Sequence, residues 1–255
     1  MATFPETWVQ VFGPLVLRVD GQRCEQDLRT RQVRELAAFL IVNRRRTVSR
    51  DELVTILWPE DVAPGAADSL NTLLSRLRKV CGHERIAGRG ALRLSLPDDA
   101  WIDIEVAERK LHQAESLVAQ GNFLGAWAPA RIALATTKRG FLPDIDAPWT
   151  DQWRRHVENL RLSAFEAMAE SALGIGGAEL GGAERAGRAL IEAAPLRETG
   201  YRYLIEYFAA RDDVASSLQV YDSMRVQLRE ELGVAPSREA QQLHLRLLER
   251  TSSPH

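Results

Sequence analysis

The stretch from residue 66 to residue 81 brings together the side chains whose types and spacing best suit recognition chemistry. When successive residues are placed about 100° apart, five apolar side chains share one sector of a helix. They are Leu70, Leu73, Leu74, Leu77 and Val80. The remaining face holds a second set, called the polar arc here: Ser69, Thr72, Arg76 and Lys79.

A helix with such a polar arc fits the major groove of DNA. There an arginine can bond two acceptors on guanine, and a threonine methyl can touch thymine. The arc therefore predicts base contacts from Thr72 and Arg76. Arg78 lies beside the apolar sector and is placed to reach a phosphate. An ordinary amphipathic surface helix shows the same pattern. The surrounding elements and charges are therefore needed to distinguish it from a DNA-recognition helix.

Positive charge is concentrated near this helix, although the 255-residue chain has a net charge of −2. Residues 1–100 carry +2 and residues 101–255 carry −4. Residues 28–50 hold seven arginines and one acid, and residues 71–97 hold five arginines, one lysine and one acid. Phosphates attract cations locally, so these two basic segments favour a nucleic-acid face. A solvated surface is the alternative.

The elements around the helix follow a recognisable order. Residues 9–19 predict a strand, a turn at Gly13-Pro14 and a second strand. Apolar residues three and four apart predict a helix that starts at Thr30 and ends before Asn43. Ser49 and Glu52 have capping-box spacing and predict a short helix that ends near Pro59. After the helix at 66–81, which ends at Gly82, residues 85–96 predict a β-hairpin. Three helices with strands and a closing hairpin describe a winged helix.

The second half predicts helices alone, because strand signals vanish from Ile102 onward. Gly, Asp and Pro breaks separate the helical segments, which lie at about 104–120, 123–138, 148–174, 183–193, 198–211, 214–232 and 237–250. Three helix pairs resemble one another around their turns, which suggests an array of helical hairpins. Pro129 is expected to kink or restart the second helix. Trp149 and Trp153 are interpreted as core anchors of the array, with a partner-facing aromatic pair as the alternative.

Several motifs carry a resemblance to known families. TVSRDELVTILW, NTLLSRLRKV and the basic hairpin resemble the OmpR-type winged-helix DNA-binding domain over residues 8–97. IDIEVAERKL, GFLPDIDAPWTDQWR, AAPLRETGYRYL and VYDSMRVQLREELGVAPS are similar to the bacterial transcriptional activator domain. The pair is the architecture of the SARP family of antibiotic-pathway regulators. It implies an α+β winged helix at 1–98 and an all-α, helical-repeat (TPR-like) domain at 99–255.

The resemblance also implies roles for single residues. It assigns base readout to Thr72 and Arg76. It assigns backbone contacts to Ser69, Arg78 and, on the preceding helix, Arg50 and Trp58, while Lys79 on the polar arc is a further backbone candidate. Trp58 has an equally weighted alternative as a core plug.

The wing and the basic loop complete the expected set. Arg89 and Arg93 are expected as wing contacts, although Ala91 and Leu92 stand where the family places an aromatic before the arginine. The loop residues Arg44, Arg45 and Arg46 are expected to touch phosphate or RNA polymerase, with surface solubility as the alternative.

The function implied is a transcriptional activator that binds promoter repeats, recruits RNA polymerase holoenzyme and regulates secondary-metabolite (antibiotic) biosynthesis. It is expected to act on double-stranded DNA as a homodimer or as tandem protomers. The alternative is a protein–protein adaptor with a winged-helix interaction module and a helical-repeat scaffold. A third possibility is a small effector bound in the helical array, for which the sequence supplies no pocket signature.

Enzymatic, metal and membrane readings find little support. Five histidines are widely separated without an HExxH pair, and two cysteines cannot build a four-ligand zinc site, although one disulfide is possible. The glycines at 174–182 follow no strand and precede no Lys-Ser/Thr pair. We therefore expect no catalytic residue, cofactor or metal. With no export signal or membrane-length segment, the expected location is cytoplasmic. Only seven residues precede the winged-helix resemblance, which begins at residue 8, so no phosphoreceiver domain is expected before it.

Overall fold

The computed structural model describes residues 5–60 and 65–252, and the chain forms two compact units that are both discontinuous in sequence. Unit 1 contains the chain up to Val106 together with Thr136–Glu158. Unit 2 contains Ala107–Ala135 and the chain from Asn159 onward. The predicted division at residues 98 and 99 describes family architecture and stays a prediction.

Unit 1 contains two small sheets. The first has the strand order β3-β2-β1-β7, and its strands are β1 (Trp8–Gln10), β2 (Val16–Val19), β3 (Gln22–Arg23) and β7 (Trp101–Ile102). The strand β7 pairs in parallel with β1, so Val9 lies opposite Ile102 and both are buried. The second sheet has the order β4-β6-β5, with strands β4 (Val48–Ser49), β5 (Ile86–Ala87) and β6 (Ala91–Leu94).

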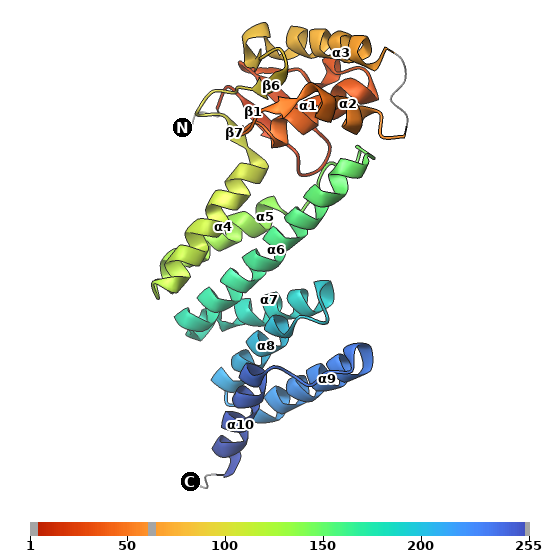
Figure 1. The fold of residues 1–255 in the computed structure, drawn as a ribbon. Coiled ribbons are helices and arrows are strands. Elements are labelled where there is room, and N and C mark those ends of the chain that lie inside the picture. The colour runs from red at the N-terminus through yellow and green to blue at the C-terminus, as the bar shows by residue number, and fades with distance from the viewer. Residues whose placement is uncertain (1–4, 61–64, 253–255) are drawn as a thin grey trace. The chain divides into compact units, whose positions relative to one another are not determined.

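Three helices complete the first part of unit 1 (Figure 1). They are α1 (Arg31–Val42), α2 (Arg50–Leu57) and α3 (Ala66–Cys81). The Thr30 hydroxyl caps α1 by accepting from the Val33 amide at 3.3 Å. The Ser49 hydroxyl caps α2 by accepting from the Glu52 amide at 3.0 Å, so the predicted cap is confirmed. The order of helices, strands and hairpin is consistent with the expected winged helix.

The segment Thr136–Glu158 packs against α1. The Trp149 ring meets Phe39 of α1 edge-on at 5.2 Å between ring centroids, and its Nε1 donates to Glu35 at 3.2 Å. Trp153 stacks on Phe141 at 5.9 Å. Trp149 and Trp153 are therefore anchors of unit 1, which corrects the expectation that they anchor the helical array.

A buried carboxylate joins the start of α4 (Asp103–Ala119) to the end of β1. Asp103 accepts from the amides of Val11 at 2.9 and 3.0 Å, Phe12 at 2.8 Å and Ile104 at 2.8 Å. Burial raises the pKa of Asp103 to about 6, although these backbone hydrogen bonds favour the ionised form. The carboxylate thus accepts from three backbone amides, as buried polar groups generally require.

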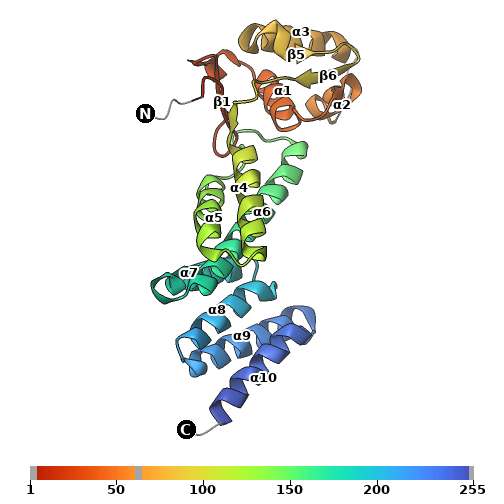
Figure 2. The same ribbon diagram turned by 90° about the vertical axis from the view of Figure 1, so that its left-hand side faces the viewer.

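Unit 2 is built from helices. The helices that follow α4 are α5 (Phe123–Thr136), α6 (Pro148–Ile175), α7 (Leu180–Ala193), α8 (Glu198–Ala210), α9 (Val214–Leu232) and α10 (Arg238–Ser252). The part of α6 up to Glu158 belongs to unit 1. Helices α4, α5 and α6 lie side by side in the figures (Figure 2). They meet through small side chains, including Ala114, Ala133 and Ala164. Small residues also let α7 and α8 approach closely, because a Cβ on Gly187 would lie 3.0 Å from the Gly200 carbonyl oxygen.

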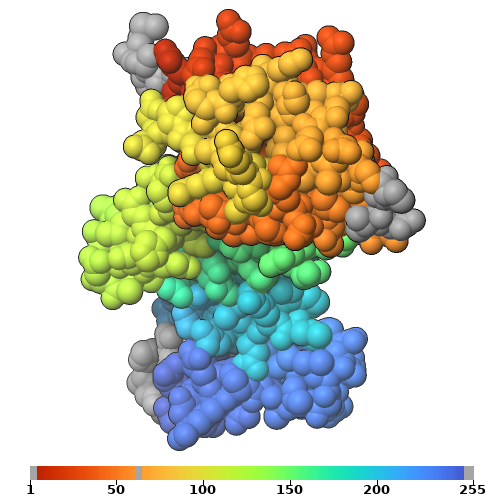
Figure 3. Space-filling view, turned by 45° about the horizontal axis from the view of Figure 1, so that its top comes forward, coloured from red at the N-terminus to blue at the C-terminus, as the bar shows by residue number. Residues whose placement is uncertain are grey.

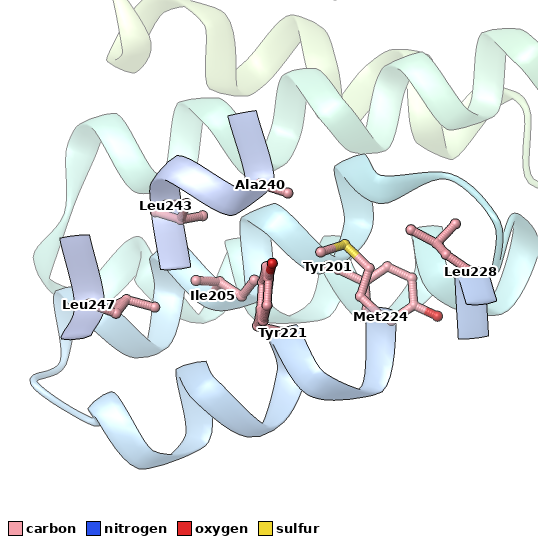
Figure 4. Close-up of a cluster of buried hydrophobic side chains, with 8 residues drawn as sticks. All are labelled: Tyr201, Ile205, Tyr221, Met224, Leu228, Ala240, Leu243 and Leu247. Atoms are coloured by element: carbon pink, nitrogen blue, oxygen red, sulfur yellow. The ribbon is translucent and has the colours of Figure 1, made fainter. Parts of the chain in front are cut away.

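The last three helices enclose a larger apolar core (Figure 4). Ile205 of α8 and Met224 of α9 are fully buried there, and Leu247 of α10 packs with them. Tyr221 stacks on His244 at 4.1 Å between ring centroids. This core explains why the chain remains helical up to Ser252.

The predicted helices are confirmed in position, but the expectation that strand structure ends before Ile102 is wrong. Ile102 lies in β7, and Phe141 forms an isolated β-bridge with Phe12, so strand structure does not end before residue 102. Of the kink or restart expected at Pro129, the restart does not occur, because α5 is continuous through that residue. A proline inside a helix removes one backbone donor and crowds the preceding turn, and Pro129 is buried in α5.

Candidate nucleic-acid interface

Helix α3 presents opposite faces to the core and to solvent. Its four leucines, at positions 70, 73, 74 and 77, are each at most 5% exposed. All four residues of the polar arc are exposed: Ser69, Thr72, Arg76 and Lys79. The helix follows Gly65 at φ +92° and ends at Gly82 at φ +99°, and both angles favour glycine. The leucine face therefore fixes the helix so that the polar arc projects outward.

Thr72 and Arg76 lie one helical turn apart on this exposed face. The Thr72 hydroxyl donates to the Asp68 carbonyl at 3.1 Å, so its proton is used within the helix. Within residues 5–60 and 65–252, no carboxylate forms an ion pair with Arg76 or Lys79. Both cations are therefore available to an anionic partner.

The hairpin of β5 and β6 lies beside α3 at the surface (Figures 2 and 3). Its tip depends on Gly88, which has φ +106° and where a Cβ would lie 1.9 Å from the Ala91 carbonyl oxygen. Arg89 is exposed at the tip. Arg93 is also exposed, and its Nε donates to the Arg44 carbonyl at 3.3 Å. A hairpin thus forms without the aromatic that the family places near its end.

Two arginines connect the hairpin to the helices. Arg50 donates to Asn71 Oδ1 on α3, and its Nη1 donates to the Arg89 carbonyl at 3.4 Å. Arg78 donates from Nε and Nη2 to the Ile86 carbonyl at 3.3 and 3.2 Å. Both are half-buried, so each guanidinium fixes the hairpin in place and retains other N–H groups for a partner.

The basic loop before α2 is organised differently. Arg44 donates to both carboxylate oxygens of Glu105, at 2.6 and 2.8 Å, and Arg45 lies 3.3 Å from the same carboxylate. Burial alone would raise the pKa of Glu105, but hydrogen bonds and charges from Arg44 and Arg45 lower it below its ordinary value. Arg46 forms a second bidentate pair, at 2.9 and 2.5 Å, with Glu52.

Trp58 and the cysteines complete the set of residues considered from the sequence. Trp58 ends α2 as its C-cap and is half-buried, a position compatible with both of its expected roles. Cys24 and Cys81 are free, so the disulfide that two cysteines allow is not formed. Burial raises the pKa of Cys24 to about 11 and that of Cys81 to about 12, which keeps both thiols protonated and weakly nucleophilic.

Sequence reasoning missed two residues beside the predicted set. Asn71 binds Arg50, and His83 lies directly after α3, close to Arg50, Arg78 and Arg89 around one hollow. Neither had a spacing signal, because their importance depends on how α2, α3 and the hairpin meet. The assigned DNA roles of the individual residues remain predictions.

Among the described residues, no group of three or more His, Cys, Asp or Glu side chains is placed to hold a metal ion. A search of the same residues finds no helix with the length and apolar character needed to span a membrane.

A family model described as the bacterial transcriptional activator domain matches residues 102–248. This is more than half of the chain, and the chain therefore belongs to that family. The match confirms the SARP-type resemblance that the motifs suggested.

Two curated relatives and one solved structure define the likeness further. The transcriptional regulatory protein EmbR of Mycobacterium tuberculosis is 30% identical over 249 residues, which cover 93% of this chain and 62% of EmbR. The regulatory protein AfsR of Streptomyces griseus is 29% identical over 217 residues, which cover 85% of this chain and 22% of AfsR. A structure of Mycobacterium tuberculosis EmbR, in complex with a low affinity phosphopeptide, aligns with a TM-score of 0.85 at 25% identity. That alignment covers 98% of this chain and 66% of the EmbR chain. The chain thus spans about three fifths of the length of EmbR and less than a quarter of AfsR.

Proposed function

We propose that this chain is a DNA-binding transcriptional activator of the SARP type, and that unit 1 contacts promoter DNA through α3 and the hairpin. The observation that carries the proposal is the exposed polar arc, whose Arg76 and Lys79 have no carboxylate partner among the described residues. Its support comes from the family membership and from two relatives, one named a transcriptional regulatory protein and the other a regulatory protein.

The proposal assigns base contacts to Thr72 and Arg76 and backbone contacts to the surrounding residues. The backbone set is Arg50, Trp58, Ser69, Arg78 and Lys79, with Arg89 and Arg93 on the wing. If this surface engages about 4–6 phosphates, the logarithm of the affinity falls with the logarithm of salt concentration at a slope of about −4 to −5. Binding is thus expected to be strongly salt-dependent.

The helical part is assigned a different task. Its acidic balance, −4 over residues 101–255, disfavours contact with phosphates. We propose that it acts as a TPR-like surface for neighbouring protomers and for RNA polymerase. Tandem binding to promoter repeats would then raise the affinity of two modules through effective concentration. We also propose that the protein regulates secondary-metabolite (antibiotic) biosynthesis and that it acts in the cytoplasm.

The test compares two neighbouring cations on α3. Duplexes are first selected from a random pool with the full chain, and binding of the selected site is then measured by fluorescence anisotropy. Arg76→Ala is expected to lose about 1–3 kcal/mol on the selected site and to relax its base preference. Lys79→Ala is expected to weaken all duplexes nearly equally and to reduce the salt slope by about 1.

Two outcomes would contradict the proposal. Unchanged binding in Arg76→Ala would remove the base-readout assignment. An absence of salt-sensitive binding to any duplex would favour the alternative of a protein–protein adaptor, in which the winged helix is an interaction module.

A further inference from the structure

Unit 1 has a hollow of about 520 Å³ where α2, α3 and the hairpin meet. We call it the arginine pocket. Its lining residues are Arg50, Arg78, His83, Ile86, Gly88 and Arg89. They come from four separate places: the start of α2, the last turn of α3, the segment after Gly82, and the hairpin.

The lining of the arginine pocket is cationic and contains no acidic residue. Three of the six residues are arginines, a fourth is a histidine, and none is acidic. Within the described parts of the chain, Arg50, Arg78 and Arg89 form no ion pair with a carboxylate. The basic loop differs, since Arg44, Arg45 and Arg46 all contact a glutamate.

The arginines are held in place by neutral oxygens. Arg50 binds an asparagine side-chain oxygen and a backbone carbonyl, and Arg78 binds a backbone carbonyl with two of its donors. Such contacts orient a guanidinium without neutralising its charge. Each guanidinium has five N–H donors, so both retain donors for a further acceptor.

Like charges gathered around one hollow repel each other, and a bound anion would relieve that repulsion. Arginine forks match the oxygen geometry of phosphate and can bind it with two parallel hydrogen bonds. The chemistry of the lining thus suits a phosphate group.

We propose that the arginine pocket seats a phosphodiester of the DNA strand that passes between α3 and the hairpin, and that His83 is one of its ligands. This inference rests on the proposed function and deepens it. It makes Arg50, Arg78 and Arg89 ligands of one backbone position instead of three independent contacts. It also adds His83, which is exposed and forms part of no other interaction described above.

The test is a charge series at position 83 in the full chain. His83 is exposed, so its replacement leaves the core intact. Duplex affinity and its salt slope are measured by anisotropy for wild type, His83→Arg, His83→Ala and His83→Glu. We expect affinity to fall in the order Arg, His, Ala, Glu, with about a tenfold range or more across the series and a shallower salt slope toward Glu. The same series at His112, an exposed histidine on α4, is the matched control and should leave both quantities unchanged.

A second measurement probes the pocket without DNA. The NMR signals of the His83 ring are followed during titration with inorganic phosphate, and with chloride at equal ionic strength. We expect a saturable shift with phosphate only, and a weaker one in Arg78→Lys, which keeps the charge and loses the guanidinium fork.

The outcomes separate this inference from the proposed function. If wild type binds duplexes with strong salt dependence but all residues at position 83 give the same affinity and slope, the pocket assignment is wrong and the proposed function stands. If phosphate shifts the His83 signals while the charge series has no effect on duplex binding, the pocket holds free anions only, and the assignment to DNA is overturned. If no duplex binds, the proposed function fails, and the inference fails with it.

Discussion

Two arginine-rich parts of unit 1 look alike as sequence and differ in what their side chains contact. In the basic loop, the guanidinium groups of Arg44, Arg45 and Arg46 all meet glutamates. On α3, Arg76 and Lys79 are exposed and have no acidic partner among the described residues. The number of cationic residues in a segment therefore does not show how many of them are available to bind a polyanion.

The difference lies in which acids reach each segment. Glu105 pairs with Arg44 across 61 positions of sequence, because β7 and the start of α4 return to the sheet of unit 1. The Arg44 and Glu105 side chains are only 19% and 11% exposed. This pair therefore stabilises the folded chain. The cations of α3, in contrast, stay hydrated until an anionic partner binds them.

Breaking the Arg44–Glu105 pair should give the largest effect. Arg44→Ala leaves the Glu105 carboxylate in a poorly solvated place with only Arg45 nearby, and the expected loss is about 2–4 kcal/mol of unfolding free energy. Urea denaturation of the full chain measures it. Replacing both partners, as in Arg44→Met with Glu105→Leu, should restore most of the stability, because no charge is then left without a partner. A single variant as stable as wild type would show that the pair does not support the fold.

Changing Arg76 should separate binding from folding. Arg76→Ala is expected to alter the unfolding free energy by no more than about 0.5 kcal/mol, since the side chain is exposed and unpaired. The same variant should lose about 1–3 kcal/mol on a selected DNA site. A large drop in stability would mean that Arg76 has a structural role, and the contrast between the two segments would weaken.

Lowering the pH should remove the stability that the Arg44–Glu105 pair contributes and leave the cations of α3 unaffected. The pKa of Glu105 is lower in the folded chain than its ordinary value, despite burial, because of its two arginine partners. Stability from this pair is therefore present above the ordinary glutamate pKa and is lost as the pH falls through the folded value. As the pH is lowered from neutral to acidic, the free energy of unfolding should decline less steeply in the Arg44→Met/Glu105→Leu double variant than in wild type. Parallel curves would contradict this assignment.

The smallest effect is expected at Arg46. Its pair with Glu52 is 47% and 35% exposed, so solvent screens most of the attraction. Arg46→Ala should cost no more than about 1 kcal/mol of unfolding free energy. Because Glu52 already engages the guanidinium, the salt slope of DNA binding should change less than in Lys79→Ala. An equal change would show that DNA displaces Glu52 and recruits the loop.

Local patterns predicted the helices well. The leucine spacing and the two flanking glycines place α3 at Ala66–Cys81, and the Ser49–Glu52 spacing places the start of α2. These signals are local, because a cap or an apolar stripe depends on residues within a few positions of one another. The base-contact candidates Thr72 and Arg76 were also accessible from sequence, since exposure follows directly from the helical period.

Long-range partners were beyond such patterns. The strand β7 has two residues, too few for alternation to reveal, and its pairing with β1 joins positions more than ninety residues apart. Trp149 and Trp153 are four residues apart, a spacing that suggested anchors of the helical array, yet the Trp149 ring packs on α1. For the same reason the sequence could not show that Arg44 is neutralised or that His83 lies beside three arginines.

The discontinuity of unit 1 has a practical consequence for protein engineering. A fragment that stops at residue 98 would lack Ile102, Asp103 and Phe141, which fill or bond the edge of the first sheet, as well as the Trp149 ring on α1. Chimeras that exchange DNA specificity between family members should therefore swap the exposed surface of α3 and the hairpin. They should leave intact the three places, after residues 106, 135 and 158, where the chain passes from one unit to the other.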